Sequence, residues 1–361
     1  MKVLFDARYI RVDFHDGISR YSAELAAALS QLTPVTFLIH DERQRESLPE
    51  GADCLKIHAP TSAKEPWTAR VLNRYKPDAV FSPMQTMGAA GRRFGLILTL
   101  HDTIYYRHRT PPRDLAWPIR LGWRLFHLSY WPQRLTLNAA DVVATVSETS
   151  KREFERVRLT KRPIVVIPNA PKLVENQKSG ASVAASGPTN LIYMGSFMPY
   201  KNVETLIRGM AFLPDHTLHL LSRISPARRA ELAALVPLDA RVVFHEGVTD
   251  EEYERLLRDN AVLVTASKDE GYGLPLAEAL TQGVPVVASD LPIFHEVAAG
   301  GALYFETTNP GDFALKVREL GDPAVLAEVI ARGTEHSKMF SWDRSARILL
   351  ETLEAVARGS A

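Results

Sequence analysis

The sequence is poor in cysteine, in net charge and in long apolar runs, and each shortage excludes a class of protein. Its one cysteine, Cys54, excludes an intramolecular disulfide and a thiolate-rich zinc site, as is typical of a reducing cytosol. We expect Cys54 to be a small, buried apolar side chain. The formal net charge of +1 provides no overall field for a polyanion, so no nucleic-acid partner is expected.

Segments for crossing a membrane or for export are also missing. No window of about eighteen uncharged apolar residues occurs, and the opening MKVLFDARYI is too short and polar for a signal sequence. We therefore expect a cytoplasmic chain whose membrane contact, where it occurs, is peripheral on the inner face of the plasma membrane. An Asp-x-Asp element and the full three-glycine dinucleotide pattern are absent as well, and neither a metal ion nor a cofactor is expected.

Short runs rich in Val, Ile and Leu alternate with longer helical patterns along the whole chain. The first half contains KVLFDA, VTFLIH, DAVFSP, LILTLHD, DVVATVS and PIVVIPNA, and the second half contains NLIYMGS, HTLHLLS, VVFHEG, AVLVTAS, PVVASD and ALYFE. Such runs are typical of buried parallel strands. The alternation predicts the α/β class, with two Rossmann-like, doubly wound parallel-sheet domains facing each other across a cleft.

A change of composition separates the two predicted domains. Residues 173–189 are rich in Ser, Gly, Ala and Pro without apolar periodicity, which indicates a linker between domains 1–172 and 190–339. The last segment, about 340–361, predicts a helix whose apolar stripe needs a partner surface in either domain. The stripe consists of Leu349, Leu350, Leu353, Val356 and Ala357.

The stretch DEGYGLPLAEAL holds two carboxylates around a tight turn. Glu270 is expected in the loop after a strand, and Glu278 in the first turn of a helix that begins near Pro275. Gly271 and Gly273 allow close backbone approach, and a helix start attracts phosphate. The pair is compatible with a glycosidase dyad, with a ligand clamp, or with an exposed loop acid and a helix-dipole acid.

A lysine occupies a similar place in the preceding strand-to-helix turn of the same domain. YMGSFMPYKN runs from a strand through Gly195 to a helix that begins near Asn202, which places Lys201 beside the helix start. An ammonium there suits a diphosphate. The alternative is an ordinary surface lysine.

The first half offers weaker signals of the same kind. Gly17 precedes a helix with an apolar face, and it is either a phosphate-approach glycine or a simple turn. His101 and Asp102 end a strand at the sheet edge where doubly wound folds bind ligands. The alternative for His101 is a histidine satisfied by hydrogen bonds at a strand terminus.

Taken in order, these pieces resemble one enzyme family. The segments TLHD, VSETSK, VIPNA, GSFMPYKN, E-GYGLPLA-E and GVPVVAS lie at the spacings of the retaining glycosyltransferases of family four, which have the GT-B fold. The resemblance covers nearly the whole chain, and the E-x7-E element is its most specific part. It implies a nucleoside diphosphate sugar on the second domain, a glycan or lipid-linked acceptor mainly on the first, and a final helix that crosses back to the first.

The resemblance also implies roles for single residues. Glu278 matches the carboxylate that binds the ribose, and Glu270 matches the carboxylate that faces the donor sugar. Lys201 matches the cation on the diphosphate, and Gly17 matches the glycine at the distal phosphate. His101 matches the histidine beside C6 of the sugar. His101, Glu270 and Lys201 are the expected catalytic residues. The remaining donor-binding residues are expected to be Gly195, Ser196, Arg223, Gly271, Tyr272, Gly273 and Leu274.

One position departs from the family pattern. Many relatives carry an arginine next to or shortly before the lysine, whereas this chain has Ser196 and Tyr200 there. We expect another residue, with Arg223 as the candidate, to supply the missing charge on the leaving group.

The acceptor side is expected around residues 105–135, where six arginines and one acid are interleaved with aromatic residues. This composition suits an anionic membrane surface or a lipid-linked acceptor. The alternative is an amphipathic helix packed on the first domain with solvated arginines. The expected acceptor or membrane residues are Asp102, Arg107, Arg109, Arg120, Trp123 and Arg124.

The predicted activity is transfer of a hexose with retained configuration and without metal. Within the family, GISRY and MPYKN favour GDP-mannose as donor, with a UDP-sugar (glucose, galactose or N-acetylglucosamine) as the alternative. A binding module without turnover and a nucleotide-sugar epimerase are the competing classes.

Overall fold

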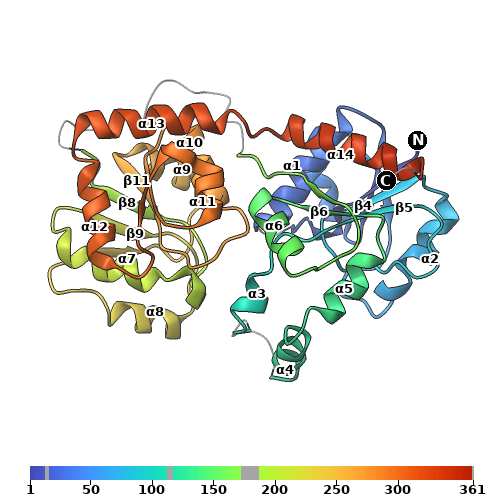
Figure 1. The fold of residues 1–361 in the computed structure, drawn as a ribbon, viewed down its shortest axis with the longest axis horizontal. Helices are drawn as coiled ribbons and strands as arrows, with labels where there is room; N and C mark the ends of the chain where they lie inside the picture. The colour runs from blue at the N-terminus through green and yellow to red at the C-terminus, as the bar shows by residue number, and fades with distance from the viewer. Residues whose placement is uncertain (13–15, 112–116, 172–186, 360–361) are drawn as a thin grey trace. The chain divides into compact units, whose positions relative to one another are not determined.

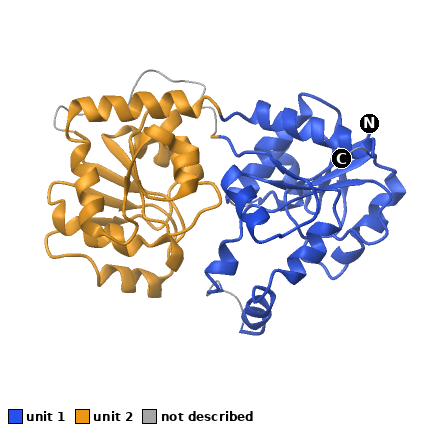
Figure 2. Ribbon diagram, in the orientation of Figure 1, with its two compact units in different colours: residues 1–170, 340–361 blue, residues 171–339 orange. Residues whose placement is uncertain are grey.

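The computed structural model describes residues 1–12, 16–111, 117–171 and 187–359. The chain divides into two compact units: unit 1 comprises Met1–Ala170 and Phe340–Ala361, and unit 2 comprises Pro171–Met339 (Figure 2). Most of the predicted linker, residues 173–189, lies outside the described residues. Each unit is built around one parallel sheet, which confirms the predicted α/β class.

The sheet of unit 1 has seven parallel strands in the order β3-β2-β1-β4-β5-β6-β7. Their bounds are β1 Val3–Asp6, β2 Val35–Ile39, β3 Asp53–Lys56, β4 Ala79–Ser82, β5 Gly95–Thr99, β6 Val142–Thr145 and β7 Ile164–Val166. The apolar runs predicted six of these strands. The missed strand, β3, is a short edge strand with charged ends, so Cys54 on it is half-buried rather than buried as expected.

Helices cover both faces of this sheet (Figure 1). They are α1 Gly17–Ser30, α2 Thr68–Leu72, α3 Ile104–Arg107, α4 Trp117–Phe126, α5 Trp131–Asn138, α6 Glu148–Arg156 and α14 Trp342–Ala357. Short 3-10 turns are η1 Ala7–Tyr9, η2 Glu42–Ser47, η3 Glu65–Trp67 and η4 Asn73–Tyr75.

The final helix, α14, belongs to unit 1, where it contacts α1, β4 and β5 (Figure 1). Its stripe is buried at Leu349, Leu353 and Val356. The packing is close, because a Cβ added at Gly95 on β5 would lie 2.2 Å from Cγ1 of Val356. The hydroxyl of Ser345 also donates to the carbonyl oxygen of Pro168 at 2.7 Å. The partner surface that the stripe required is therefore the first unit.

Unit 2 repeats the scheme with six parallel strands in the order β10-β9-β8-β11-β12-β13. The strands are β8 Asn190–Tyr193, β9 Thr217–Leu220, β10 Arg241–Phe244, β11 Ala261–Thr265, β12 Val286–Ser289 and β13 Ala302–Phe305. The helices are α7 Val203–Gly209, α8 Pro226–Ala233, α9 Asp250–Arg258, α10 Leu274–Thr281, α11 Pro292–Ala298, α12 Pro310–Glu319 and α13 Pro323–Ser337, with 3-10 turns η5 Pro199–Lys201, η6 Met210–Phe212 and η7 Ala299–Gly301. All six strands follow the predicted runs.

Strand order reverses once in each sheet, and this determines where ligands bind. In unit 1 the reversal falls between β1 and β4, and in unit 2 between β8 and β11. Loops that follow such neighbouring strands leave the sheet at its carboxyl edge on opposite faces, which opens a crevice between them. The candidate site of unit 2 therefore lies at the ends of β8 and β11.

Candidate functional site

The two loops at the reversal point of unit 2 carry the predicted lysine and the first predicted glutamate. Lys201 ends η5 in the loop after β8, and Glu270 lies in the loop after β11. Nζ of Lys201 forms an ion pair with Oε1 of Glu270. The two side chains are 16% and 13% exposed, so the pair is largely shielded from water. The structure thus brings these two residues together, although they are far apart in sequence.

The loops around this pair are held by further hydrogen bonds. The hydroxyl of Ser267 donates to Oε1 of Glu270 at 2.8 Å. The backbone N–H of Lys268 donates to the carbonyl oxygen of Tyr200 at 2.7 Å, which joins one loop to the other. Oε2 of Glu270 has no hydrogen-bond partner among the residues that the structure describes. That oxygen can accept a hydrogen bond from a ligand hydroxyl.

Asn202 fixes the turn that presents Lys201. It adopts a left-handed backbone with φ of 54°, a conformation that asparagine tolerates better than most residues. Its side-chain amide donates to the carbonyl oxygens of Ala266 at 3.1 Å and Thr307 at 2.7 Å. The buried amide therefore fastens the start of α7 to the end of β11.

A glycine turn connects Glu270 to α10. Gly273 has φ of 97°, and a Cβ there would lie 3.0 Å from the ring of Phe294. Gly273, the N-cap residue of α10, has no side chain that could cap the helix start, and Pro275 lies in its first turn. Backbone N–H groups and the positive end of the helix dipole at such a start suit an anion.

The other residues of this motif are more buried than the sequence suggested. Glu278 is 8% exposed and lies beyond the first turn of α10, which begins at Leu274, so its predicted first-turn position is wrong. The difference arises because Gly273 is the residue that caps the helix. Gly271 and Tyr272 are buried, and burial raises the pKa of the Tyr272 phenol. Glu278 is thus a buried carboxylate and does not act as a solvent-exposed acid that offsets the helix dipole.

The segment after β8 is shaped by its glycine. The N–H of Gly195 donates to the hydroxyl of Ser222 at 3.1 Å, and a Cβ at Gly195 would lie 2.9 Å from the phenol oxygen of Tyr193. That phenol donates to the carbonyl oxygen of Ser196 at 2.7 Å. The side chain of Ser196 is exposed, as a residue open to a ligand must be.

Two arginines of unit 2 are candidates for the charge that the missing family arginine would supply. Arg223 follows β9, is exposed, and its stem packs at Gly247. Arg228 on α8, which the sequence analysis did not select, donates through Nε to the carbonyl oxygen of Phe197 at 3.1 Å and forms an ion pair with Glu204. Arg228 was not predicted because it lies far in sequence from the loop after β8.

Arg228 is a fixed brace of the loop after β8. Burial acts to lower its pKa, but the bonds that it donates to Glu204 and Glu231 outweigh burial and raise the pKa overall. Both carboxylates and the Phe197 carbonyl occupy its guanidinium. Arg228 therefore stabilises the loop that carries Lys201, and Arg223 stays the residue with the more accessible charge.

In unit 1, His101 and Gly17 lie after β5 and β1. Nε2 of His101 lies 2.9 Å from the carbonyl oxygen of Pro83, a contact that requires the proton on Nε2. The ring also meets Tyr21 edge-on at 5.1 Å, and desolvation by burial lowers the pKa of His101. The imidazole is therefore neutral near pH 7, with Nδ1 as an acceptor. Gly17 is the first residue of α1, whose cap is Asp16.

The reversal point of unit 1 also holds an ionic network that we did not predict from the sequence. The guanidinium of Arg8 pairs with both oxygens of Asp6 and with both oxygens of Glu65, at distances of 2.7 to 2.9 Å. Ser82, at the end of β4, donates to Asp6 at 3.2 Å, and His58 contacts Glu65 at 3.1 Å. The available signal was the charged pair DAR directly after an apolar strand. The network fixes the carboxyl edge of the sheet.

Most of the predicted acceptor-side residues have partners within the protein. Asp102 accepts a hydrogen bond from the N–H of Ile104 at 2.9 Å, and Arg107 pairs with Glu153 at 2.8 Å. Nε of Arg109 donates to the carbonyl oxygen of Tyr106 at 3.1 Å. These contacts order the segment around α3.

The three predicted residues on α4 divide between its two sides. The ring of Trp123 lies 5.2 Å from the ring of Tyr105 and 4.1 Å from that of His127, so Trp123 faces the protein. Arg120 and Arg124 form no hydrogen bond or ion pair with any described residue. Residues 112–116, which precede the helix in the arginine-rich stretch, lie outside the described residues.

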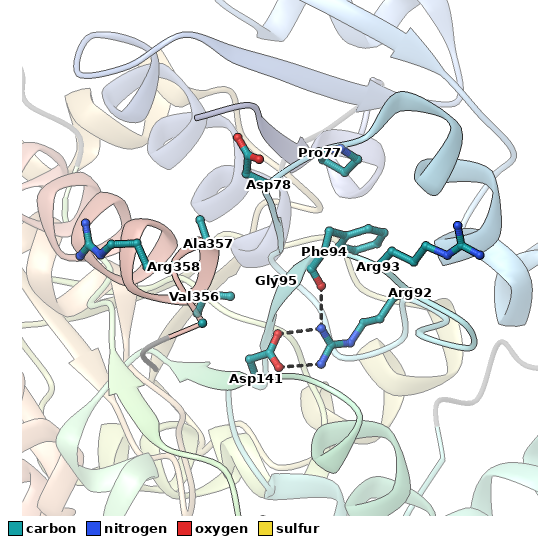
Figure 3. A pocket seen from close by; sticks show the side chains of 11 residues that line it. Pro77, Asp78, Arg92, Arg93, Phe94, Gly95, Asp141, Val356, Ala357 and Arg358 are labelled. Carbon is teal, nitrogen blue, oxygen red and sulfur yellow. Dashed lines mark hydrogen bonds and ion pairs between the residues drawn. The ribbon is translucent and has the colours of Figure 1, made fainter.

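A cavity of about 530 Å³ lies at the opposite, amino edge of the unit 1 sheet (Figure 3). Arg92 and Asp141 form a two-bond ion pair in its wall, each contact at 2.7 Å, and Arg92 also donates to the carbonyl oxygen of Phe94 at 2.6 Å. None of the predicted site residues lines it. Ligands of doubly wound sheets bind at the carboxyl edge, so this cavity is separate from the candidate site.

Within the described ranges, no three His, Cys, Asp or Glu side chains gather in a way that could hold a metal ion. Over the same residues, no helix has the length and apolarity needed to cross a bilayer.

Two doubly wound units, with a lysine, a carboxylate and a helix start preceded by Gly273 at the reversal point of the second, are typical of the GT-B glycosyltransferases. The sequence profiles described as "Glycosyltransferase Family 4" and "Glycosyl transferases group 1" match residues 15–171 and 174–332. The chain belongs to the family 4 glycosyltransferases, a family of transferase enzymes.

Relatives give finer comparisons over parts of the chain. It is 32% identical over 120 residues to the serotype-specific mannosyltransferase WbdA of Escherichia coli, covering 33% of this chain and 14% of WbdA. It is 28% identical over 159 residues to the O-antigen chain mannosyltransferase RfbU of Salmonella typhimurium, covering 43% of this chain and 44% of RfbU. The match thus spans less than half the length of either relative.

A solved structure matches over nearly the whole length. Anabaena HepE in complex with UDP-glucose superposes with a TM-score of 0.71 at 17% identity, covering 98% of this chain and 100% of HepE. At this identity the likeness establishes the shared fold alone.

Proposed function

We propose that the protein transfers a hexose, with retained configuration, from a nucleoside diphosphate sugar to a glycan or lipid-linked acceptor in cell-surface polysaccharide or glycolipid synthesis. The donor that we favour is GDP-mannose, which the likeness to two mannosyltransferases supports. The single observation that carries the proposal is the Lys201–Glu270 pair in the loops that lead to the starts of α7 and α10. It combines a cation and a helix dipole for a diphosphate with a carboxylate for a sugar.

The chemistry follows from where charge develops. When the bond between the anomeric carbon and the diphosphate oxygen breaks, the sugar gains oxocarbenium character and negative charge builds on the departing phosphate. Lys201, the start of α10 and the backbone at Gly17 are proposed to stabilise that anion, without a metal ion. The acceptor oxygen bonds to the same face of the sugar while its proton passes to the leaving phosphate oxygen, so no protein nucleophile is needed.

The carboxylates then serve as binding groups. Glu270 is proposed to accept hydrogen bonds from donor-sugar hydroxyls through Oε2, and Glu278 to accept them from the ribose. His101 is proposed to contact the sugar near C6 as a neutral imidazole, since burial lowers its pKa. A glycosidase would need two carboxyl groups that flank one bond at a set separation, whereas the pairing of Glu270 with Lys201 supports a role in binding.

A thermal-shift panel of GDP-mannose, UDP-glucose, UDP-galactose and UDP-N-acetylglucosamine tests the donor assignment. The true donor stabilises the chain by RT ln(1 + [L]/Kd), about 2.7 kcal/mol at a hundredfold excess over Kd. Glu278→Ala should abolish the shift, because the ribose loses a charged acceptor. Glu335→Ala, an exposed glutamate of the same unit, is the matched control and should keep it. A shift that survives Glu278→Ala contradicts the ribose assignment.

The alternative donor is a UDP-sugar, which the likeness to HepE with bound UDP-glucose keeps in the panel. A binding module without turnover is the non-catalytic alternative, and donor hydrolysis by purified protein separates it from an enzyme. An epimerase would form product from donor alone, without acceptor.

For the cellular setting, we propose a protein of the cytoplasmic side that meets its acceptor at the inner membrane surface through peripheral contact. The arginine- and aromatic-rich segment around α3, α4 and α5 supports this proposal. No nucleic acid and no resident cofactor has a part in it.

A further inference from the structure

Helix α4 is unusual in that none of its residues is buried. It projects away from the sheet and covering helices of unit 1 (Figure 1). Trp117 is 75% exposed, Leu121 50% and Leu125 59%, and Leu128 just after the helix is 59% exposed. Contiguous exposed apolar side chains of this size mark interaction surfaces.

The helix is nevertheless held to the protein on one side. Rings of Trp123 and His127, one turn apart, contact the α3 rings of Tyr105 and Tyr106 at centroid distances of 5.0 to 5.9 Å. The side chain of Tyr106 also stacks on Tyr130 at 4.2 Å. The orientation of α4 is therefore set by an aromatic cluster.

The other side carries an apolar stripe. Trp117, Leu121 and Leu125 follow one another at intervals of four residues, which places them on one face of a helix. Leu128 continues the stripe past the last turn. Trp131 and Leu135 on α5, also four residues apart, are 64% and 57% exposed and add to the apolar surface of the segment.

Unpaired positive charge accompanies the stripe. Arg120 and Arg124 lie on α4 one turn apart and have no ion-pair or hydrogen-bond partner in the described part of the chain. By contrast, Arg107 is neutralised by Glu153. In the sequence from 104 to 138 the six arginines are accompanied by one acid, so no carboxylates are interleaved with the stripe.

We propose that the α4 face, defined as Trp117, Leu121, Leu125 and Leu128 with the flanking Arg120 and Arg124, docks on an anionic lipid surface. An in-plane helix inserts its apolar stripe at the headgroup boundary while its arginines meet lipid phosphates. A second copy of the chain fits less well, because a two-fold contact would bring these arginines together without acids to pair them. The inference rests on the proposed function, for which it names the surface that presents a lipid-linked acceptor.

Flotation of the full chain with vesicles tests the assignment. The chain should float with phosphatidylcholine vesicles containing phosphatidylglycerol, and much less with phosphatidylcholine alone or at high salt. Leu121→Gln with Leu125→Gln should reduce binding at least about tenfold, since apolar insertion is lost. Arg120→Gln and Arg124→Gln should each reduce it about fivefold, on anionic vesicles alone. Because all four side chains lie on the surface, the fold should persist.

The matched control is Leu238→Gln with Leu315→Gln, two leucines of unit 2 that are 93% and 51% exposed. This variant should float like the unchanged chain. Failure of the unchanged chain to float, or equal flotation of Leu121→Gln with Leu125→Gln, overturns the assignment. So does a dimer in solution that the same substitutions dissociate without any lipid binding.

The donor thermal shift separates this inference from the proposed function. If the leucine variant loses flotation while keeping the nucleotide-sugar shift, the docking surface is supported independently of the donor site. If the unchanged chain floats but no nucleotide sugar stabilises it, the docking surface stands and the proposed function fails. If nucleotide sugars stabilise a chain that does not float, the reverse holds.

Discussion

Removal of the ammonium at position 201 should impair donor binding and turnover more than stability. Lys201→Met keeps an apolar side chain of similar length. In the unchanged chain Nζ of Lys201 lies 5.4 Å from the centroid of the Tyr200 ring. The substitution deletes the charge that pairs with Glu270 and that we assign to the donor diphosphate. Two effects of different size follow.

The functional effect is the larger one. A hydrogen bond to a charged group contributes about 1.5 to 3 kcal/mol, so donor affinity should fall about ten- to hundredfold. Because negative charge grows on the leaving phosphate, kcat should fall further, by about 10² to 10³. The stability loss should be about 1 to 3 kcal/mol, since Glu270 keeps the Ser267 hydroxyl as a donor.

Calorimetric titration with donor, steady-state rates and urea denaturation measure the three quantities. Lys316→Met is the matched control, because Lys316 pairs with Glu319 at 2.8 Å in the same unit. Adding Glu270→Gln to Lys201→Met should recover part of the stability without restoring donor affinity. Equal donor affinity in the Lys201→Met and Lys316→Met variants would refute the reasoning.

Three further predictions concern stability. Gly273→Ala should lower the free energy of unfolding, measured by urea denaturation, by about 1 to 3 kcal/mol, because a φ of 97° is strained for alanine. Gly122→Ala, on a helix and with no neighbouring atom within reach of the new Cβ, should raise it by about 0.5 to 1 kcal/mol. Arg8→Met should lower the free energy of unfolding by about 3 to 5 kcal/mol, since two buried carboxylates lose their partner. Arg43→Met removes an exposed pair and should lower it by less than about 1 kcal/mol, so similar losses in the two variants would show that the buried network does not stabilise the fold. Burial lowers the pKa of His101, so the unfolded chain binds that proton more readily. The free energy of unfolding should therefore fall as the pH drops below about 6.5, and it should fall less for His101→Gln than for the unchanged chain between about pH 7 and pH 5. The same dependence of unfolding free energy on pH in both proteins would contradict this prediction.

The apolar runs predicted the sheets well because buried parallel strands require continuous Val, Ile and Leu. The strand that they missed, Asp53–Lys56, pairs on one side only and can carry charged ends. The final helix was predicted from its stripe, but the stripe alone did not choose between the two domains, and its packing against Gly95 depends on tertiary structure. Local patterns therefore identify elements better than they identify contacts.

The candidate site shows the same division. Lys201 and Glu270 were selected separately by their motifs, and strand order is what brings their side chains together. Arg228 was missed because its contacts to Phe197 and Glu204 depend on how α8 packs. The sequence suggested Trp123 for the membrane side, whereas its ring packs on Tyr105, because which side of α4 faces the protein depends on α3.

The central claim is that unit 2 holds a nucleoside diphosphate sugar at the ends of β8 and β11. The most direct measurement is a crystal structure of the chain with the nucleotide sugar that stabilises it most. We expect the diphosphate within hydrogen-bond distance of Nζ of Lys201 and at the start of α10, with the ribose hydroxyls on Glu278. A diphosphate bound elsewhere, such as in the cavity beside Arg92 and Asp141, would contradict it.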